Sequence, residues 1–297
     1  MDEVILNKYK EAGRIANLSL KLGTQLIKPG EDMLVVLEKI EEFIIKEGAF
    51  PAFPPQISLN SVAAHFCPEE SYFFKENDLA KLDVGVSVDG FIADNALTVD
   101  LSSNNKHKLL IEASSMALDE ALKLIRPGVR VGEIGARIQE VISNRGFSPI
   151  RNLSGHGLAR FKVHTNPSIP NFEVDSDVTL EEGMVVAIEP FATDGAGIVY
   201  ESGRGTIFNL VGEKPLRRPD SRKVLDEIKK YNGLPFSSTG LFKIFGKAKV
   251  LFALREMKQL GMLDEHPPLV DKGKGFVSQA EHSVIVLKEP VVYTRFD

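Results

Sequence analysis

Cysteine, tryptophan and long apolar runs are scarce in this sequence. It contains one cysteine, Cys67, and no tryptophan among its 297 residues. A single cysteine excludes an internal disulfide, which is typical of proteins from a reducing compartment. No stretch approaches the roughly 18 consecutive apolar residues of a membrane helix, and the first residues lack the basic and apolar segments of a secretory signal. The sequence therefore predicts a soluble, cytoplasmic protein with no membrane partner.

The net charge is also small. The chain has 36 Lys and Arg residues against 41 Asp and Glu residues, which gives a formal charge of −5. This balance provides no broad attraction to polyanions, so we expect no nucleic-acid partner. The length suits one large α/β domain or two smaller ones.

The most informative stretch is residues 81–98, where alternating apolar residues stand on both sides of an Asp-Gly pair at 89–90. Asp-Gly is a strong hairpin signal because both turn positions favour positive φ. This turn places Asp94 opposite Gly85, with Asp83 two positions along on the same face. Diagonal Cα atoms lie roughly 7–8 Å apart, so the two carboxylates can share one cation. The alternative is a pair of solvated charges on an exposed sheet face.

An internal repeat organises the rest of the chain. Leu26-Ile-Lys-Pro-Gly30 matches Leu124-Ile-Arg-Pro-Gly128 at an offset of 98 residues, and Gly48 and Gly146 share that offset. Each match lies between two amphipathic helices, so we infer two α/β halves related by a pseudo-twofold axis. The helices predicted from apolar spacing cover residues 4–27, 32–47, 104–126, 131–144, 219–231 and 241–260.

Two further carboxylates stand in strongly apolar surroundings. Glu189 ends the run 184–190, and Glu281 lies inside a strand predicted over residues 276–287. A carboxylate at such a position requires a partner, because burying an unpaired charge is costly.

The segment between these two carboxylates differs from the rest. It begins rich in glycine and continues with two amphipathic helices. We therefore predict a main domain of residues 1–192 and 271–297, with residues 193–270 as an inserted helical subdomain.

The candidate site comprises four carboxylates and one imidazole. Clustered carboxylates resist ionisation unless cations neutralise them. Oxygen-rich ligation with one imidazole and no thiolate suits Mn²⁺, Fe²⁺, Co²⁺ or a catalytic Zn²⁺, and a structural calcium site is disfavoured by the histidine. Two divalent ions would balance four negative charges. The candidate ligands are Asp83, Asp94, His156, Glu189 and Glu281.

These residues and their neighbours resemble the methionine aminopeptidases over nearly the whole chain. The long insertion is similar to that of the type 2 branch, and the lack of a charged N-terminal extension is similar to its archaeal members. The motifs are Asp83 followed eleven residues later by Asp94, Asn152-Leu-Ser-Gly-His156, Ala187-Ile-Glu-Pro190 and Gln279-Ala-Glu-His282. The resemblance implies the pita-bread fold and removal of the initiator methionine from peptides and nascent polypeptides, with a preference for a small second residue. It also implies a monomer and adds the ribosome as a candidate partner.

The resemblance assigns roles to the five ligands. Asp83 would bind one metal, Asp94 and Glu281 would bridge both, and His156 and Glu189 would complete the second. A metal-bridged hydroxide would attack the methionine carbonyl, and Glu189 would carry the proton to the leaving amine.

Other residues are assigned less directly. By resemblance, His65 and His164 would hydrogen-bond the substrate, and Phe53 and Val163 would line the methionine pocket. A lone histidine is more often structural, and both apolar residues could equally be core. His107 and His266 are predicted on surface stretches without a role, His282 is predicted to be structural or to support the site, and Cys67 is expected to be buried or at the rim.

Two rival functions remain open on this fold. A prolidase or Xaa-Pro aminopeptidase usually carries an additional N-terminal domain, whereas here 82 residues precede Asp83. A non-enzymatic binding protein on the same fold would have lost ligands, whereas all five are present.

Overall fold

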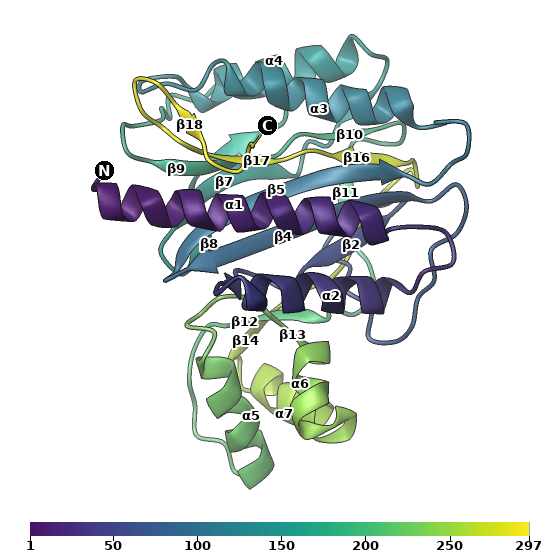
Figure 1. The fold of residues 1–297 in the computed structure, drawn as a ribbon, viewed down its shortest axis with the longest axis vertical. Helices are drawn as coiled ribbons and strands as arrows, with labels where there is room; N and C mark the ends of the chain where they lie inside the picture. The colour runs from purple at the N-terminus through teal and green to yellow at the C-terminus, as the bar shows by residue number, and fades with distance from the viewer. Residues whose placement is uncertain (297) are drawn as a thin grey trace.

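The computed structural model describes residues 1–296 and divides them into a mixed α/β body and a smaller helical part below it (Figure 1). Helix α1 packs on the long strands β4 and β5, helix α2 lies beside β1 and β2, and helices α3 and α4 cover the other end of the body. Among the described residues, no helix is both long and apolar enough to cross a membrane. The helices of the body are α1 (Glu3–Leu26), α2 (Met33–Lys46), α3 (Lys108–Leu122) and α4 (Val131–Ser143).

Strands β4 (Leu79–Val88) and β5 (Phe91–Asp100) form the predicted hairpin. Asp89 and Gly90 have φ angles of 52° and 87°, as a turn with two positive φ values requires. The observed register pairs Gly85 with Asp94, which confirms the prediction. The turn fixes the register because a one-residue slip would send every side chain to the opposite face.

The inferred duplication appears in the backbone hydrogen bonds of the two halves. The amide of Gly30 donates to the carbonyl of Phe74 at 2.8 Å, and that of Gly128 donates to Leu180 at 2.7 Å. Both glycines have φ of 87°, which favours glycine over residues with a Cβ. Each half therefore fastens the start of its second helix to a distant segment in the same way.

A second sheet carries the C-terminal side of the site. Its strand order is β18-β17-β9-β7-β8, and paired amide–carbonyl bonds between Ala96 and Glu281 join β5 to this part of the chain. The strands are β7 (Ser154–Ala159), β8 (Lys162–Pro170), β9 (Val185–Ile188), β17 (His282–Ile285) and β18 (Val291–Val292).

Short strands complete the sheets of the body, and the sheet β11-β15-β3 joins the two halves. β2 pairs with β4, β10 pairs with β6 and β16, and β15 pairs with β3 and β11. They are β1 (Phe50–Pro51), β2 (Gln56–Leu59), β3 (Val62–Ala64), β6 (Ser148–Pro149), β10 (Phe191–Thr193), β11 (Val199–Glu201), β15 (Leu269–Asp271) and β16 (Val277–Gln279).

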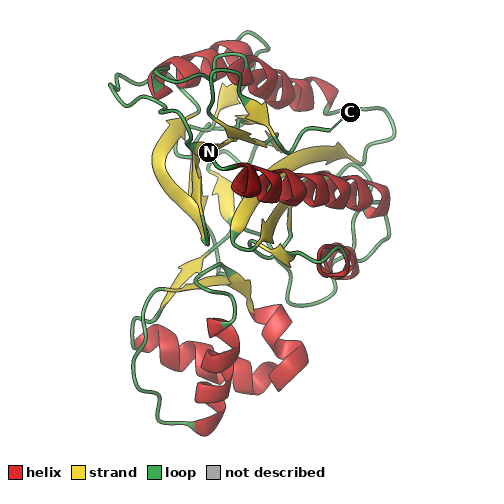
Figure 2. Cartoon of the chain, turned by 60° about the vertical axis from the view of Figure 1, so that its left-hand side comes forward, coloured by secondary structure: helices red, strands yellow, loops and turns green. Residues whose placement is uncertain are grey.

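The helical part has its own sheet and its own core (Figure 2). Strand β12 lies between β13 and β14, and helices α5 and α7 pack against each other over buried Val224 and Leu254. Residues 207–266 are here named the insertion. Its elements are β12 (Ile207–Leu210), α5 (Pro219–Lys229), β13 (Phe236–Ser237), α6 (Ser238–Phe245), α7 (Lys247–Gln259) and β14 (Leu263–His266).

Three predicted elements differ from the structure. The helix predicted over 241–260 is two helices, because Gly246 takes φ of 81° and ends the first one. The strand predicted over 276–287 is interrupted between β16 and β17, at Ala280 and Glu281. The helix predicted over 104–126 covers only Lys108–Leu122. At its start Asp100 accepts the amide of His107 at 2.8 Å and stabilises a loop, and past its end Leu124 and Ile125 donate to carbonyls three residues back.

Candidate metal centre and substrate pocket

The hairpin presents Asp83 and Asp94 on one face. Asp83 pairs with Ala96 on one side and with Gln56 on the other. Gly85, opposite Asp94, has no room for a side chain, since an added Cβ would lie 2.3 Å from the Phe53 ring. The ring of Phe53 therefore packs beside the two carboxylates, where a larger residue at position 85 would displace it.

Glu189 and Glu281 reach the same face from the second half of the chain. Glu189 follows directly after the buried strand β9. Glu281 lies in the interruption between β16 and β17, and its amide donates to the carbonyl of Ala96 at 3.0 Å. Because Ala96 pairs with Asp83, this bridge brings Glu281 beside the first two carboxylates.

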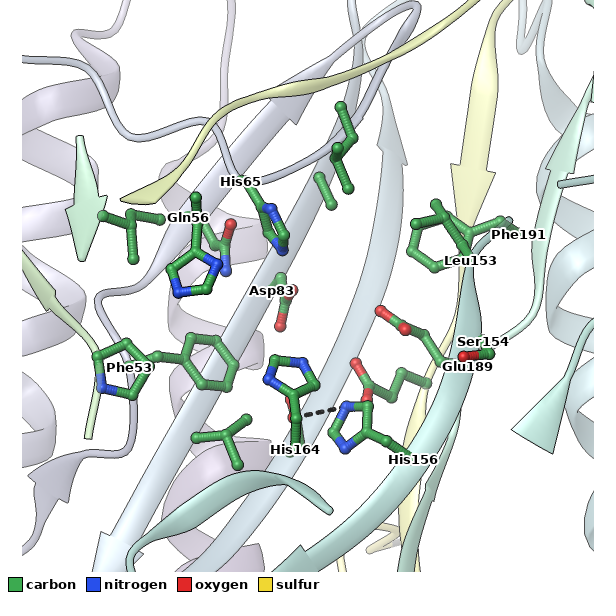
Figure 3. Close-up of a pocket in the computed structure, with 18 of the residues that line it drawn as sticks. Phe53, Gln56, His65, Asp83, Leu153, Ser154, His156, His164, Glu189 and Phe191 are labelled. Atoms are coloured by element: carbon green, nitrogen blue, oxygen red, sulfur yellow. Dashed lines mark ion pairs between the residues drawn. The ribbon is translucent and has the colours of Figure 1, made fainter. Parts of the chain in front are cut away.

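His156 completes the candidate ligand set. It lies on β7 opposite Ala187 of β9, and its Nε2 atom is 3.7 Å from Oδ2 of Asp94 (Figure 3). Burial lowers the pKa of His156 to about 3, so the ring is neutral near pH 7. A neutral imidazole offers the lone pair that a metal ligand needs.

The carboxylate oxygens have the geometry expected of a cation site. Ligand atoms of Asp94, His156 and Glu281 lie within 4.8 Å of one another, and so do those of Asp83, Glu189 and Glu281. Buried oxygens of Asp83, Asp94 and Glu281 accept no hydrogen bond within the described residues. Buried polar atoms normally find partners. The residues present therefore fit two adjacent divalent cations that share Glu281.

The pKa values of the four carboxyl groups also favour bound cations. Burial raises the pKa of Asp83 to about 7. Burial, reinforced by neighbouring carboxylates, holds the pKa values of Asp94, Glu189 and Glu281 well above their ordinary range. Four carboxylates confined together cannot all ionise at neutral pH without nearby positive charge, which bound cations would supply.

Gln279 supports two of these carboxylates. Its Nε2 atom donates to Oε1 of Glu189 at 2.8 Å, and a hydrogen bond from Gln279 also counters the rise in the pKa of Asp83. The sequence placed Gln279 in a family motif without giving it a role. Its alternation with Glu281 along one strand face was the available signal.

His65 and His164 face the same space as the carboxylates (Figure 3). The ring centroid of His164 lies 4.3 Å from that of His156. Burial lowers the pKa values of His65 and His164 to about 4. Both rings are therefore neutral near pH 7 and can each donate one hydrogen bond and accept another.

Phe53 and Val163 are buried, with 6% and 5% of their surface exposed, and both line this cavity. Its volume is about 200 Å³, which is less than the roughly 300–1,000 Å³ of sites for drug-sized ligands. The cavity thus gathers all nine residues predicted from the sequence, although their individual roles stay predictions. Further apolar walls come from Leu153, Phe191, Ile207 and Leu269.

The surface placement predicted for two other histidines is wrong. His107 is buried beside the ring of Phe276, with ring centroids 4.2 Å apart, at the start of α3. His266 lines the cavity, and its ring centroid is 5.7 Å from that of His65. His107 stands at the polar start of the helix predicted over 104–126 and His266 lies outside the predicted elements, so only the tertiary fold reveals the surroundings of either ring.

Comparison with known proteins places these features in a family. A model of metallopeptidase family M24 matches residues 7–211. A methionine aminopeptidase of Archaeoglobus fulgidus is 44% identical over 289 residues, covering 96% of this chain and 97% of the relative. One from Methanocaldococcus jannaschii is 41% identical over 290 residues and covers 97% of both chains. The solved structure of a methionine aminopeptidase from Thermotoga maritima aligns with a TM-score of 0.74 at 23% identity, over 100% of this chain and 98% of that one, which is a likeness of fold.

Proposed function

The chain belongs to the methionine aminopeptidases of metallopeptidase family M24, and on that premise we propose that it hydrolyses the peptide bond after an N-terminal methionine. The observation that carries the proposal is the cluster of His156 and four carboxylates at the wall of a small cavity, in which several carboxylate oxygens accept no hydrogen bond from the described residues. The size of the cavity favours one terminal residue over an internal stretch of peptide. A cavity that accepts only one residue suits an enzyme that cleaves at the end of a peptide chain.

The residues that would hold two divalent cations are Asp83, Asp94, His156, Glu189 and Glu281. Such cations, Co²⁺, Mn²⁺, Fe²⁺ or Zn²⁺ by the chemistry of the donors, supply a Lewis acid that activates water and polarises a carbonyl. Their number and identity are part of the proposal. The shared position of Glu281 between the two donor groups supports a pair of ions over one.

We assign proton transfer to Glu189. One of its oxygens accepts a hydrogen bond from Gln279, and the carboxylate could take a proton from the attacking water and deliver it to the leaving nitrogen. His164 stands beside His156 at the cavity wall, where its neutral ring can donate to the carbonyl of the scissile bond. His65 is assigned to the nitrogen on the other side of that bond.

Phe53 and Val163 are assigned to the methionine side chain. A flexible thioether is favoured by contact with an aromatic face, and the Phe53 ring is held in place against Gly85. A preference for a small second residue would follow if the cavity mouth admits little beyond the terminal residue.

Association with ribosomes is a further proposal, with the insertion as its contact surface. Residues 207–266 contain 12 Lys and Arg against seven Asp and Glu, whereas the remainder contains 24 against 34. A locally basic surface on an acidic protein can dock on a polyanion. Co-sedimentation with ribosomes, lost as salt rises, would support this. Monomeric state and cytoplasmic location also stay predictions.

The activity is tested by release of methionine from Met-Gly-Met-Met and Met-Pro peptides. Metal-stripped protein should release none, and addition of Co²⁺ or Mn²⁺ should restore release. No release by intact, metal-loaded protein would favour the binding-protein alternative. Cleavage of Xaa-Pro peptides with other first residues would favour the prolidase alternative.

A further inference from the structure

His266 is the histidine that the insertion contributes to the cavity. It ends strand β14 and pairs with Ile207 of β12, which also lines the cavity. Its ring is half-buried and meets the ring of His65 at an angle of 73°. Because β12 and β14 are at the base of the insertion, His266 stands where the insertion meets the catalytic residues.

A short chain of hydrogen bonds fixes the proton on this ring. Nδ2 of Asn209 donates to the carbonyl of Gly233 at 3.0 Å, so the carboxamide oxygen of Asn209 must face the other way. That oxygen is 2.7 Å from Nε2 of His266. A carboxamide oxygen can only accept, so Nε2 carries the proton and Nδ1 is left as an acceptor.

The ring of His266 stands where a bound peptide would pass. It lines the cavity beside His65, with 5.7 Å between the two ring centroids. The acceptor at Nδ1 can therefore receive a hydrogen bond from the substrate, and a peptide supplies an N–H at every residue except proline.

We propose that Nδ1 of His266 accepts a hydrogen bond from the backbone N–H of the third residue of the peptide substrate. The inference rests on the proposed function. A cavity of about 200 Å³ holds one terminal residue. The second and later residues of the peptide must therefore extend out of the cavity, in contact with the residues that line its wall. The N–H of the second residue belongs to the scissile bond, and that of the third is the next donor along the peptide.

A purely structural role is the alternative for this histidine. The bond to Asn209 joins β12 to β14, and its loss alone could weaken the insertion. Two substitutions separate these roles. His266→Asn keeps an amide oxygen near the position of Nδ1 but cannot reach Asn209, and His266→Gln keeps a group near Nε2 for Asn209 but loses the acceptor at Nδ1.

The experiment compares Met-Gly-Met-Met with Met-Gly-Pro-Met, which lacks the N–H at its third residue. Each peptide is assayed with metal-loaded wild type, His266→Gln and His266→Asn, and thermal unfolding and metal content are measured alongside. One hydrogen bond corresponds to a change of roughly five- to tenfold in kcat/KM. We expect His266→Gln to lose this factor, mainly through KM, on Met-Gly-Met-Met and to lose nothing on Met-Gly-Pro-Met. His266→Asn should retain more of the activity on Met-Gly-Met-Met.

Equal losses on both peptides, or no loss on either, would overturn the inference while leaving the aminopeptidase activity established by the wild type. A fall in unfolding temperature for His266→Asn with unchanged peptide discrimination in His266→Gln would assign His266 to structure alone. Wild-type protein that releases methionine from neither peptide would overturn the proposed function, and the inference would fall with it.

Discussion

The carboxamide of Gln279 donates a hydrogen bond of 2.8 Å to the carboxylate of Glu189. This bond opposes the effect of burial, which raises the pKa of Glu189. A glutamine is suited to this position because it stabilises a negative charge without adding one to a space that already holds four carboxylates. It also leaves the second oxygen of Glu189 for the proposed cation site.

Replacing Gln279 should weaken catalysis without emptying the site. In Gln279→Leu the pKa of Glu189 should rise, so the acid limb of the profile of kcat/KM against pH should move to higher pH. A loss of roughly 10- to 100-fold near neutral pH is expected for a partner of this kind. Steady-state assays from pH 5 to 9 would measure it. Ser278→Ala removes a bond to the Leu110 carbonyl on the other face, and this control should leave the limb unmoved.

Removal of metal should make stability depend on pH. The folded pKa of Asp83 is about 7 and those of Asp94, Glu189 and Glu281 are well above their ordinary values, whereas unfolded carboxyls titrate near 4. At these carboxyls the folded metal-free protein binds more protons than the unfolded chain, which lowers its free energy of unfolding as pH rises from about 4 through 7 and beyond. The buried histidines act the other way below about pH 7, because their folded pKa values of about 3 to 4 lie below the unfolded value near 6.5. Thermal unfolding at about pH 7 and pH 9, with chelator or with Mn²⁺, therefore tests the carboxyls. A metal-free protein at least as stable at the higher pH as at the lower one would contradict the cluster.

Asp94→Asn should abolish turnover, because a neutral amide would replace a carboxylate of the proposed cation site. We expect kcat/KM to fall by at least about 100-fold and bound metal to decrease. Asp89→Asn is a matched control on the same hairpin, since Asp89 is exposed and asparagine tolerates its φ of 52°. Full activity of Asp94→Asn would remove this residue from the site.

Gly85→Ala should disturb methionine binding. The added Cβ would lie 2.3 Å from the Phe53 ring, and overpacking of this kind costs about 1–3 kcal/mol. KM should rise because Phe53 is displaced from the pocket wall. Gly48→Ala provides the comparison: its Cβ meets nothing within 4 Å, but φ is 83°, so stability should fall by about 1 kcal/mol with unchanged KM. Equal KM values for the two variants would argue against Phe53 as a pocket residue.

His164→Ala should lower kcat more than it lowers metal content. The ring lies beside His156 rather than within either group of ligand atoms, so its loss should remove the proposed donor to the substrate and leave the candidate ligands in place. A reduction of roughly 10²- to 10⁴-fold is expected for a group that moves or shares a proton in the reaction. Metal analysis of purified protein alongside kinetics would separate the effects. A parallel loss of bound metal would mean that His164 is a ligand.

Much of the fold followed from the sequence because its signals were local. The Asp-Gly turn determined the register that brings Asp83 and Asp94 together, and the repeated Pro-Gly motif indicated the two halves. The methionine aminopeptidase relatives confirm the implied pita-bread fold and its type of enzyme. The break before Glu281 was missed because it depends on the bridge to Ala96, which no local propensity encodes. The position of His266 was missed for the same reason.

The candidate ligands come from segments that are far apart in the chain. Asp83 and Glu281 are separated by about 200 residues, and each belongs to a different half of the duplicated body. A cation held by both would close that long loop, and long loops give the largest theoretical gain from a cross-link. In a protein with one cysteine, bound metal would thus cross-link the two halves, as a disulfide cross-links a secreted domain. Unlike a disulfide, this cross-link can be removed by a chelator and restored by adding metal, without any oxidant.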